Sequence, residues 1–224
     1  MIKNKTFLYS VAFLAMTIPS QGRFVYGLVL VLELLLLEAV GTLFKLLASK
    51  LKFNDIASYF VMMFVISFTI LFRQIFAILY SEIILTMGFI IYFPAVSTIL
   101  FYTVFEAEQT TLGNALKTNL LKILKFSFPI LCFFLFRDIA GYGTITFFGS
   151  NHQLYEKLIF NPQKIGALSF FASIPGALIL SASLIYLLIL AKNQIMAHAA
   201  IQNEQNAPAH NATAQTAPSQ GETK

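Results

Sequence analysis

Six apolar stretches, separated by short polar segments, dominate the pattern of this chain. They cover residues 7–18, 24–47, 59–80, 83–105, 120–136 and 165–191. A helix that spans a bilayer needs about 17–25 residues, so the first stretch reaches across only as a half-helix or together with its flanks. The pattern predicts an all-α integral membrane protein with six transmembrane helices.

Two of the six stretches run into a proline after about a dozen residues. Residues 7–18 are followed by Pro19, and residues 83–93 by Pro94. Proline removes a backbone donor and breaks a helix, and interrupted segments at matching places in two halves are typical of inverted repeats. We therefore expect interrupted helices 1 and 4, each opening one of two inverted three-helix repeats.

The composition places the chain in a membrane. It is 58% hydrophobic and 11% charged, and its mean hydropathy is +0.76. A soluble domain of 224 residues could not bury that much apolar surface. The net charge of +5 comes from residues that lie between apolar stretches, where they signal topology, so we expect a lipid bilayer and no nucleic acid as partner.

The positive residues predict the orientation. Cytoplasmic loops are rich in Lys and Arg, and a cytoplasmic N-terminus places ten of the 15 on that side, which favours two cytoplasmic termini. The ten are Lys3, Lys5, Lys45, Lys50, Lys52, Lys117, Lys122, Lys125, Lys192 and Lys224. The other five, outside or in the membrane, are Arg23, Arg73, Arg137, Lys157 and Lys164.

The two ends of the chain need separate interpretation. Lys3 and Lys5 before an apolar stretch also resemble a secretory signal peptide, but Ile18 and Pro19 occupy the place of a small-residue cleavage site, which favours a retained helix. Residues 194–224 are rich in Ala, Gln, Asn, Thr and Pro. We expect a six-helix membrane domain over residues 1–193 and a disordered cytoplasmic tail over 194–224.

Among the charged residues inside the predicted spans, Glu33, Glu38 and Arg73 are candidate intramembrane polar sites. Each costs about 2.5–3.5 kcal/mol at a helix centre unless it has a partner or water. Glu33 and Arg73 lie at similar depths on neighbouring antiparallel segments, which predicts an ion pair. Glu38 lies deeper, near the level of Ser67, and is either an ion or proton site or a neutral acid hydrogen-bonded to a neighbouring helix.

Motifs for metal and nucleophile chemistry are few. His152, His198 and His210 have no spacing that would gather ligands on one face, and no phosphate-binding or hydrolase motif is present. Cys132 stands alone among Phe and Leu residues, so we expect it to be a packing residue. The sequence predicts neither a catalytic residue nor a bound cofactor in this chain.

One turn carries a family resemblance. The stretch from Arg137 and Asp138 through Gly141 to Gly143, predicted as an exposed turn, resembles the R-E-I-x-G-x-G-T stretch of the RnfE/NqrD family, whose members are six-helix membrane proteins of the Rnf and Nqr complexes. Residues 159–160 and 173–177 are similar to the family's I-F and L-P-P-G-A segments. Residues 87–96 and 106–107 are similar to its entry to the fourth helix.

The resemblance implies two inverted three-helix repeats and pairing with a homologous six-helix sister subunit in the bacterial inner membrane. It also implies flavoprotein and iron–sulfur partners in an ion-translocating electron-transport complex, in which this chain is a translocase subunit and not an enzyme by itself. In the family, cysteines of the two broken helices hold an interfacial [2Fe-2S] cluster. Here Leu100 stands at one of these places, and residues 16–19 contain no cysteine at the other.

The missing cysteines leave three interpretations of function. The chain is a subunit of an Rnf/Nqr-type complex, a stand-alone small-molecule or ion transporter, or a redox-inactive structural membrane subunit. Fe–S clusters are held by thiolates as a rule, so we expect no cluster ligand from this chain.

Overall fold

The structure is a computed structural model that describes residues 5–51, 56–106, 112–149, 153–160 and 168–206. Over these residues the chain is mostly helical. Four of the described helices contain a stretch long and apolar enough to cross a membrane: α2 (Phe24–Lys50), α3 (Ala57–Leu79), α6 (Leu112–Tyr142) and α7 (Ile174–Asn206). Lengths and hydropathies of this kind are those of a membrane protein.

Shorter helices occupy the two proline-bounded segments. Helix α1 (Lys5–Thr17) ends just before Pro19. The segment around Pro94 consists of α4 (Ser81–Met87), the 3-10 turn η1 (Ile90–Tyr92) and α5 (Thr98–Glu106). Gly88 ends α4 with a φ of 53°, a conformation that glycine adopts without strain, and Pro94 lies in the turn before α5.

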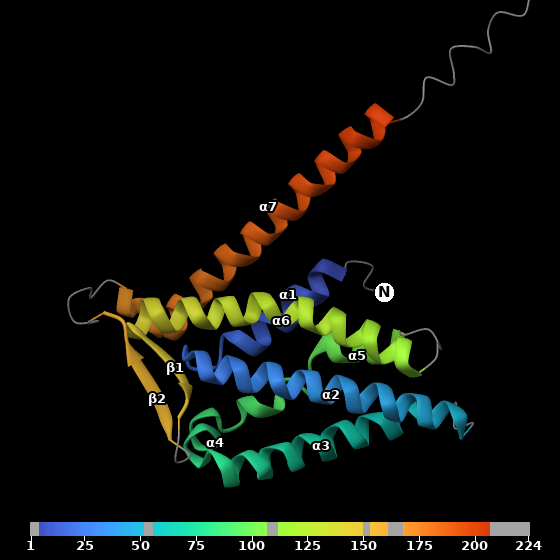
Figure 1. The fold of residues 1–224 in the computed structure, drawn as a ribbon, viewed down its shortest axis with the longest axis horizontal. Coiled ribbons are helices and arrows are strands. Elements are labelled where there is room, and N and C mark those ends of the chain that lie inside the picture. Colours follow the sequence, from blue (N-terminus) through green and yellow to red (C-terminus); the bar gives the residue numbers. More distant parts are fainter. Residues whose placement is uncertain (1–4, 52–55, 107–111, 150–152, 161–167, 207–224) are drawn as a thin grey trace, which may run out of the picture. The chain divides into compact units, whose positions relative to one another are not determined.

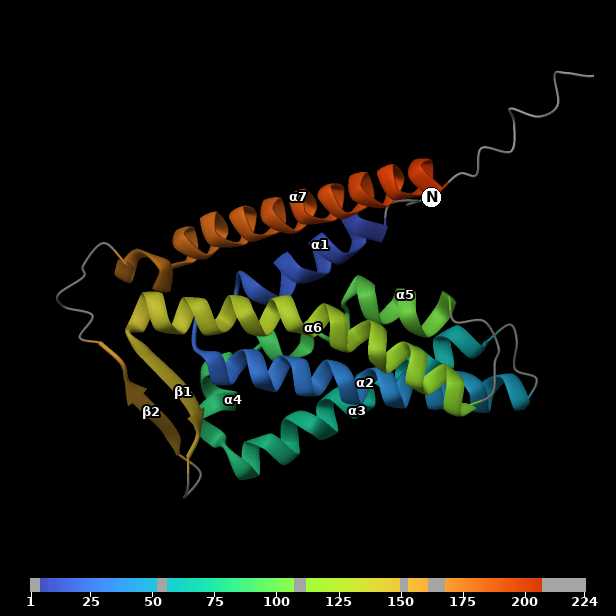
Figure 2. The same ribbon diagram turned by 45° about the horizontal axis from the view of Figure 1, so that its top comes forward.

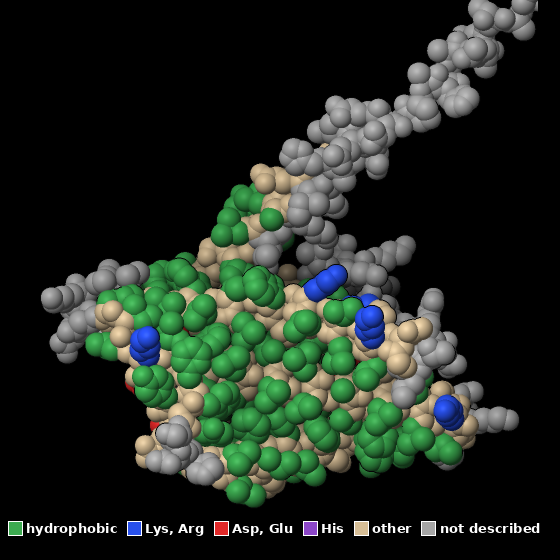
Figure 3. Space-filling view, viewed as in Figure 1, with side chains coloured by type: hydrophobic (Ala, Val, Ile, Leu, Met, Phe, Trp, Pro, Cys, Tyr) green, Lys and Arg blue, Asp and Glu red, His purple; other side chains and the backbone are tan. Residues whose placement is uncertain are grey.

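Helices α2 and α6 pack along each other and form the centre of the bundle (Figures 1 and 2). Helix α3 packs on α2, and α1 lies against both α5 and α6. Gly27 of α2 makes the close approach possible, since a Cβ there would lie 2.5 Å from the Phe134 ring of α6. Many large hydrophobic side chains are exposed, and they are spread across the face drawn in Figure 3, as expected where lipid is the solvent.

A short β-hairpin, which the expectation of an all-α chain did not include, follows α6 in this otherwise helical structure. Strands β1 (Thr144–Phe148) and β2 (Leu154–Leu158) pair antiparallel, with Thr144 opposite Leu158. β-Branched and aromatic residues in β1 favour a strand. Gly143, with a φ of 67°, turns the chain from α6 into it.

The chain divides into two compact units, residues 1–183 and 184–224. The first contains α1 to α6, the hairpin, the 3-10 turn η4 (Leu168–Ala172) and the beginning of α7. In the second unit α7 continues to Asn206, so residues 194–206 are helical where we expected a disordered tail. Good helix formers fill this stretch up to Pro208, while residues 207–224 of the predicted tail lie outside the described residues.

Candidate functional site

The guanidinium group of Arg137, near the end of α6, is buried and bonded to backbone carbonyls. Nη1 donates to the carbonyl of Ser20 at 2.7 Å and, more weakly, to that of Thr17 at 3.4 Å. Nε donates to Phe171 at 3.1 Å, while Nη2 donates to Ala172 at 3.0 Å and to Ser173 at 3.5 Å. Arg137 therefore connects the end of α1 to the segment that leads into α7.

Asp138 binds the beginning of α2 and the first strand. One carboxylate oxygen accepts from the Phe24 amide at 3.1 Å and from the amide and hydroxyl of Thr146, both at 2.8 Å. The other accepts from the Thr144 hydroxyl at 3.1 Å. The first amide groups of a helix have no partner within the helix, so Asp138 caps α2 from a distant part of the chain.

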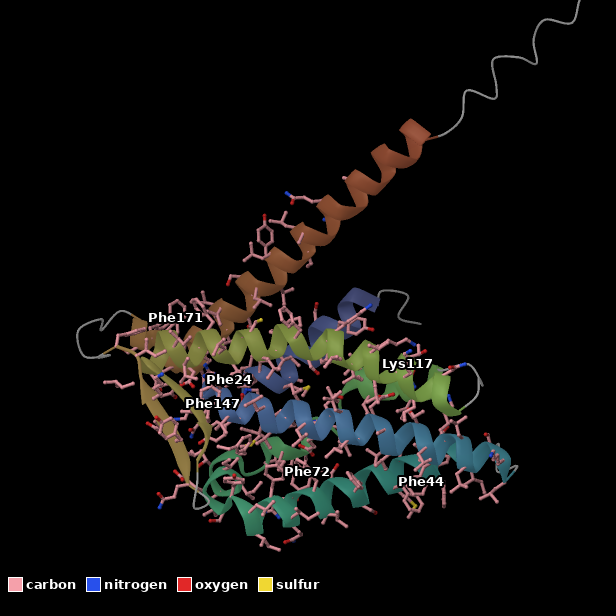
Figure 4. All side chains as sticks on the ribbon, in the orientation of Figure 1. Phe24, Phe44, Phe72, Lys117, Phe147 and Phe171 are labelled. Carbon is pink, nitrogen blue, oxygen red and sulfur yellow. The ribbon has the colours of Figure 1, made fainter. Side chains whose placement is uncertain are left out.

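The turn after this pair is buried, although the sequence predicted an exposed one, because η4 and residue 160 cover it. A Cβ at Gly141 would lie 2.8 Å from the Ala172 amide nitrogen, and one at Gly143 would lie 2.4 Å from the Phe160 carbonyl oxygen. Phe24, Phe147 and Phe171 gather at this end of the bundle (Figure 4). The motif residues join the end of α1, the beginning of α2, strand β1 and the turn η4. These contacts give them a role in the fold rather than in a reaction.

A second polar cluster lies in the middle of the bundle, around Glu38 of α2. The Thr42 hydroxyl donates to Glu38 Oε1 at 3.2 Å, and the Thr103 hydroxyl of α5 lies 2.5 Å from Oε2. Asn119 of α6 donates to the Thr42 hydroxyl and to the Thr103 carbonyl, each at 3.2 Å. All four side chains are at most 2% exposed. We call these residues the Glu38 cluster.

The Glu38 cluster is the strongest candidate for chemistry among the described residues. A carboxyl group inside a membrane span is costly and usually functional, and here three helices supply it with hydroxyl and amide groups. The sequence singled out Glu38 but missed its partners. Thr42 was readable as the residue one helical turn further on, whereas Thr103 and Asn119 meet Glu38 only through tertiary packing.

The predicted Glu33–Arg73 ion pair is wrong. Glu33 is completely buried, and neither of its carboxyl oxygens has a hydrogen-bond partner among the described residues. The guanidinium of Arg73 lies instead 6.0 Å from the centre of the Tyr92 ring, with its Nε unpaired within the same ranges. Equal depth on two antiparallel helices fixes the height of two side chains but not the direction in which each points around its helix.

Ser67, expected near the level of Glu38, is exposed and donates to the Met63 carbonyl of its own helix. The described hydrogen-bond partners of Glu38 come from α2 and α5, with Asn119 of α6 behind them. The sequence did not indicate which helices supply polar groups to Glu38. In the structure, α2, α5 and α6 supply them.

No thiolate stands at the places that the resemblance assigns to iron–sulfur ligands. Leu100 is buried in α5 at the first of these places, residues 16–19 at the end of α1 contain no cysteine at the other, and Cys132 is exposed on α6. Cys132 is therefore not the buried packing residue that the sequence predicted. No group of three metal-ligating side chains occurs within the described ranges, and His152 and His210 lie outside them.

Comparisons with protein-family models, with curated proteins and with solved structures found no match to this chain. The function is therefore inferred from the residues themselves and from the geometry that they adopt.

Proposed function

We propose that this chain is a membrane subunit of an Rnf/Nqr-type ion-translocating electron-transport complex, paired with a homologous six-helix sister subunit. In this proposal it crosses the inner membrane of a bacterium six times, with both termini in the cytoplasm. It serves as part of a translocase and is not an enzyme by itself. Flavoprotein and iron–sulfur subunits are its further partners.

The observation that carries the proposal is the packing of the two interrupted segments. Helix α1 lies against α6, α5 lies against α2, and α1 and α5 also contact each other. If α1–α2–α3 and α4/α5–α6–α7 are the two repeats, the short helix of each one packs on the first long helix of the other. Such an exchange is expected of inverted repeats whose broken helices meet between the halves.

The Arg137–Asp138 pair supports the same assignment. These residues, with Gly141 and Gly143, carry the family resemblance, and their contacts join the end of α1 and the beginning of α2 to the end of α6. They connect the first proposed repeat to the second. A motif with this task is needed by the scaffold whether or not a cluster is present, which explains how it can persist without the cysteines.

The role proposed within the complex is therefore scaffolding and ion passage. This role includes no electron transfer through the chain, because Leu100 stands at one ligand position and residues 16–19 offer no thiolate at the other. A sister subunit with two cysteines would supply only half of a conventional ligand set.

The Glu38 cluster favours a second candidate, a stand-alone transporter of an ion or small molecule. A buried carboxyl with hydroxyl and amide neighbours in mid-bundle is typical of coupling sites in such proteins. The redox-inactive structural subunit, the third interpretation, has no specific contact in its favour among the described residues.

Co-purification from native membranes tests the proposal. The tagged chain is extracted in a mild detergent, and its partners are identified by mass spectrometry, with a tagged multi-pass protein of similar size from the same membranes as control. We expect a homologous six-helix protein together with flavin- and iron–sulfur-containing subunits. Recovery of the chain alone, with transport activity in liposomes, would support the stand-alone transporter instead.

The same preparation addresses the missing ligands. Iron analysis and EPR of the complex show whether an interfacial cluster is held by other chains. A complex with activity but without such a signal supports a role of this chain in scaffolding and ion passage.

A further inference from the structure

We infer that Glu38 is an intramembrane proton-binding site that exchanges protons with the side of the membrane on which α2 ends. This exchange depends on the side chains of this protein alone and not on its assembly into a complex. The hydrogen bonds around the carboxyl group satisfy both of its protonation states.

The Thr103 hydroxyl changes its hydrogen-bond acceptor when Glu38 gains or loses a proton. It has one hydrogen but lies within hydrogen-bond distance of three acceptors: Glu38 Oε2 at 2.5 Å, the Ile99 carbonyl at 2.9 Å and the Leu100 carbonyl at 3.2 Å. When Glu38 is ionised, the hydroxyl donates to the carboxylate. When Glu38 is protonated, the acid donates to Thr103, whose hydroxyl rotates and donates to the Ile99 carbonyl. Only one hydrogen has to turn between the two states.

The other carboxyl oxygen is held in both states. Thr42 donates to Oε1, and Asn119 donates to Thr42 in turn, so the amide keeps the Thr42 hydroxyl hydrogen directed toward Glu38. A second donation from Asn119 to the Thr103 carbonyl fixes the distance between α5 and α6. The site is therefore organised before the proton arrives, and the described contacts account for both oxygens in either state.

Two lysines lie on helices that supply the Glu38 cluster, Lys45 on α2 and Lys122 on α6. α5 contributes the Thr103 hydroxyl and backbone carbonyls, and α3 contributes apolar contact through Val65 near Gly41. The titratable neighbour on the same helix, Glu33, lies five residues away and points to a different side.

The polarity of α2 is different in the two directions from Glu38. On the face that carries Glu38, the residues toward Lys50 are Thr42, Lys45 and Ser49, at intervals of three or four positions. In the opposite direction the same face carries Leu34, Val31 and Gly27, and Gly27 is closed by the Phe134 ring. On this face of α2, the polar side chains among the described residues therefore lie between Glu38 and the Lys50 end, where Phe44 and Lys117 also lie (Figure 4).

Glu33 shows what a site without these features looks like. It is as deeply buried as Glu38, but no donor of the described residues faces either of its oxygens. A negative charge there would lack the hydrogen bonds that Glu38 receives, so we expect Glu33 to stay protonated. The two carboxyls on one helix thus form a matched pair, in which one exchanges protons and the other does not.

Infrared difference spectroscopy tests the inference on the full chain in lipid nanodiscs. The band measured is the C=O stretch of neutral carboxyl groups, followed as the pH of the bathing solution is raised. We expect the wild type to lose part of this band reversibly as a proton leaves Glu38 for water. Glu38→Gln removes that pH-dependent part completely, whereas Glu33→Gln removes only intensity that does not change with pH.

Two variants at Thr103 distinguish a role of its hydroxyl in proton binding by Glu38 from an effect of packing alone. Thr103→Ser keeps the hydroxyl and is expected to retain the wild-type transition, while Thr103→Val removes the partner of both states and shifts the frequency of the titrating band. Size-exclusion profiles confirm that each variant is folded. The inference is overturned if folded Glu38→Gln keeps the full pH-dependent change, or if sodium ions at constant pH remove the band as effectively as a rise in pH.

Discussion

Replacing Arg137 by Met is expected to be among the most destabilising single changes outside the apolar core. The side chain is 1% exposed, and three of its hydrogen bonds are 3.1 Å or shorter, to Ser20, Ala172 and Phe171. A hydrogen bond from a charged donor contributes about 1.5–3 kcal/mol, and the desolvation cost that Met avoids offsets part of the sum. We expect the free energy of unfolding to fall by about 2–4 kcal/mol.

A loss of that size is visible in a thermal unfolding assay. For a chain of this length about 1 kcal/mol shifts the midpoint by about 2–4 °C, so the expected decrease is roughly 5–15 °C. The sequence contains no Trp, so the folded fraction is best followed by size-exclusion of a fluorescent-protein fusion heated in detergent. Arg137→Lys keeps the charge but not the planar arrangement of donors, and should lie between Arg137→Met and the wild type.

Arg23 provides the matched control. It pairs with Glu156 at the surface and lies 5.3 Å from the centre of the Tyr142 ring, and its side chain is 25% exposed. Exposed pairs contribute about 0–1 kcal/mol, so Arg23→Met should shift the midpoint by less than about 4 °C. If Arg137→Met unfolded within about 2 °C of the wild type, the role assigned to Arg137 would be wrong.

Three further changes probe other parts of the molecule. Asp138→Ala leaves the amides of the capped helix and strand without their acceptor, and should lower the unfolding midpoint and speed hydrogen exchange at Phe24. Gly143→Ala, at a positive φ and against the Phe160 carbonyl, should strongly reduce the yield of folded protein, whereas Gly113→Ala, in open space on α6, should leave the yield equal or higher. Glu33→Met removes a buried carboxyl that has no partner among the described residues and should raise the midpoint; a lower midpoint would reveal a role for that carboxyl.

The helices could be predicted because their signal is local. An apolar stretch long enough to cross a bilayer needs no knowledge of its neighbours. A proline is a weaker signal, because α4 already ends at Met87, before Pro94, while Pro129 lies inside α6. The hairpin is not predictable in the same way, because β1 is only five residues long and follows an apolar helix, so its alternation of side chains is too short to distinguish a strand from a loop.

The candidate sites depended on information that the sequence does not carry locally. Arg137 donates to backbone carbonyls, which every residue has, so its partners cannot be recognised from their residue types. Glu38 was visible as a charge in an apolar stretch, but Thr103 lies 65 residues away and reaches it only through the packing of α5 on α2. The Glu33–Arg73 prediction failed because depth was known and rotation around the helix was not.

The most direct test of the proposed pair of oppositely oriented triplets is the side of the membrane on which chosen positions lie. Single cysteines are placed at Lys3, Glu156 and Lys224 in a Cys132→Ala background, and intact cells are treated with a maleimide that does not cross the membrane. The proposed topology predicts labelling of the cysteine at 156 alone, and labelling at 3 and 224 only after the membrane is opened. Labelling of 3 and 224 from opposite sides would contradict it.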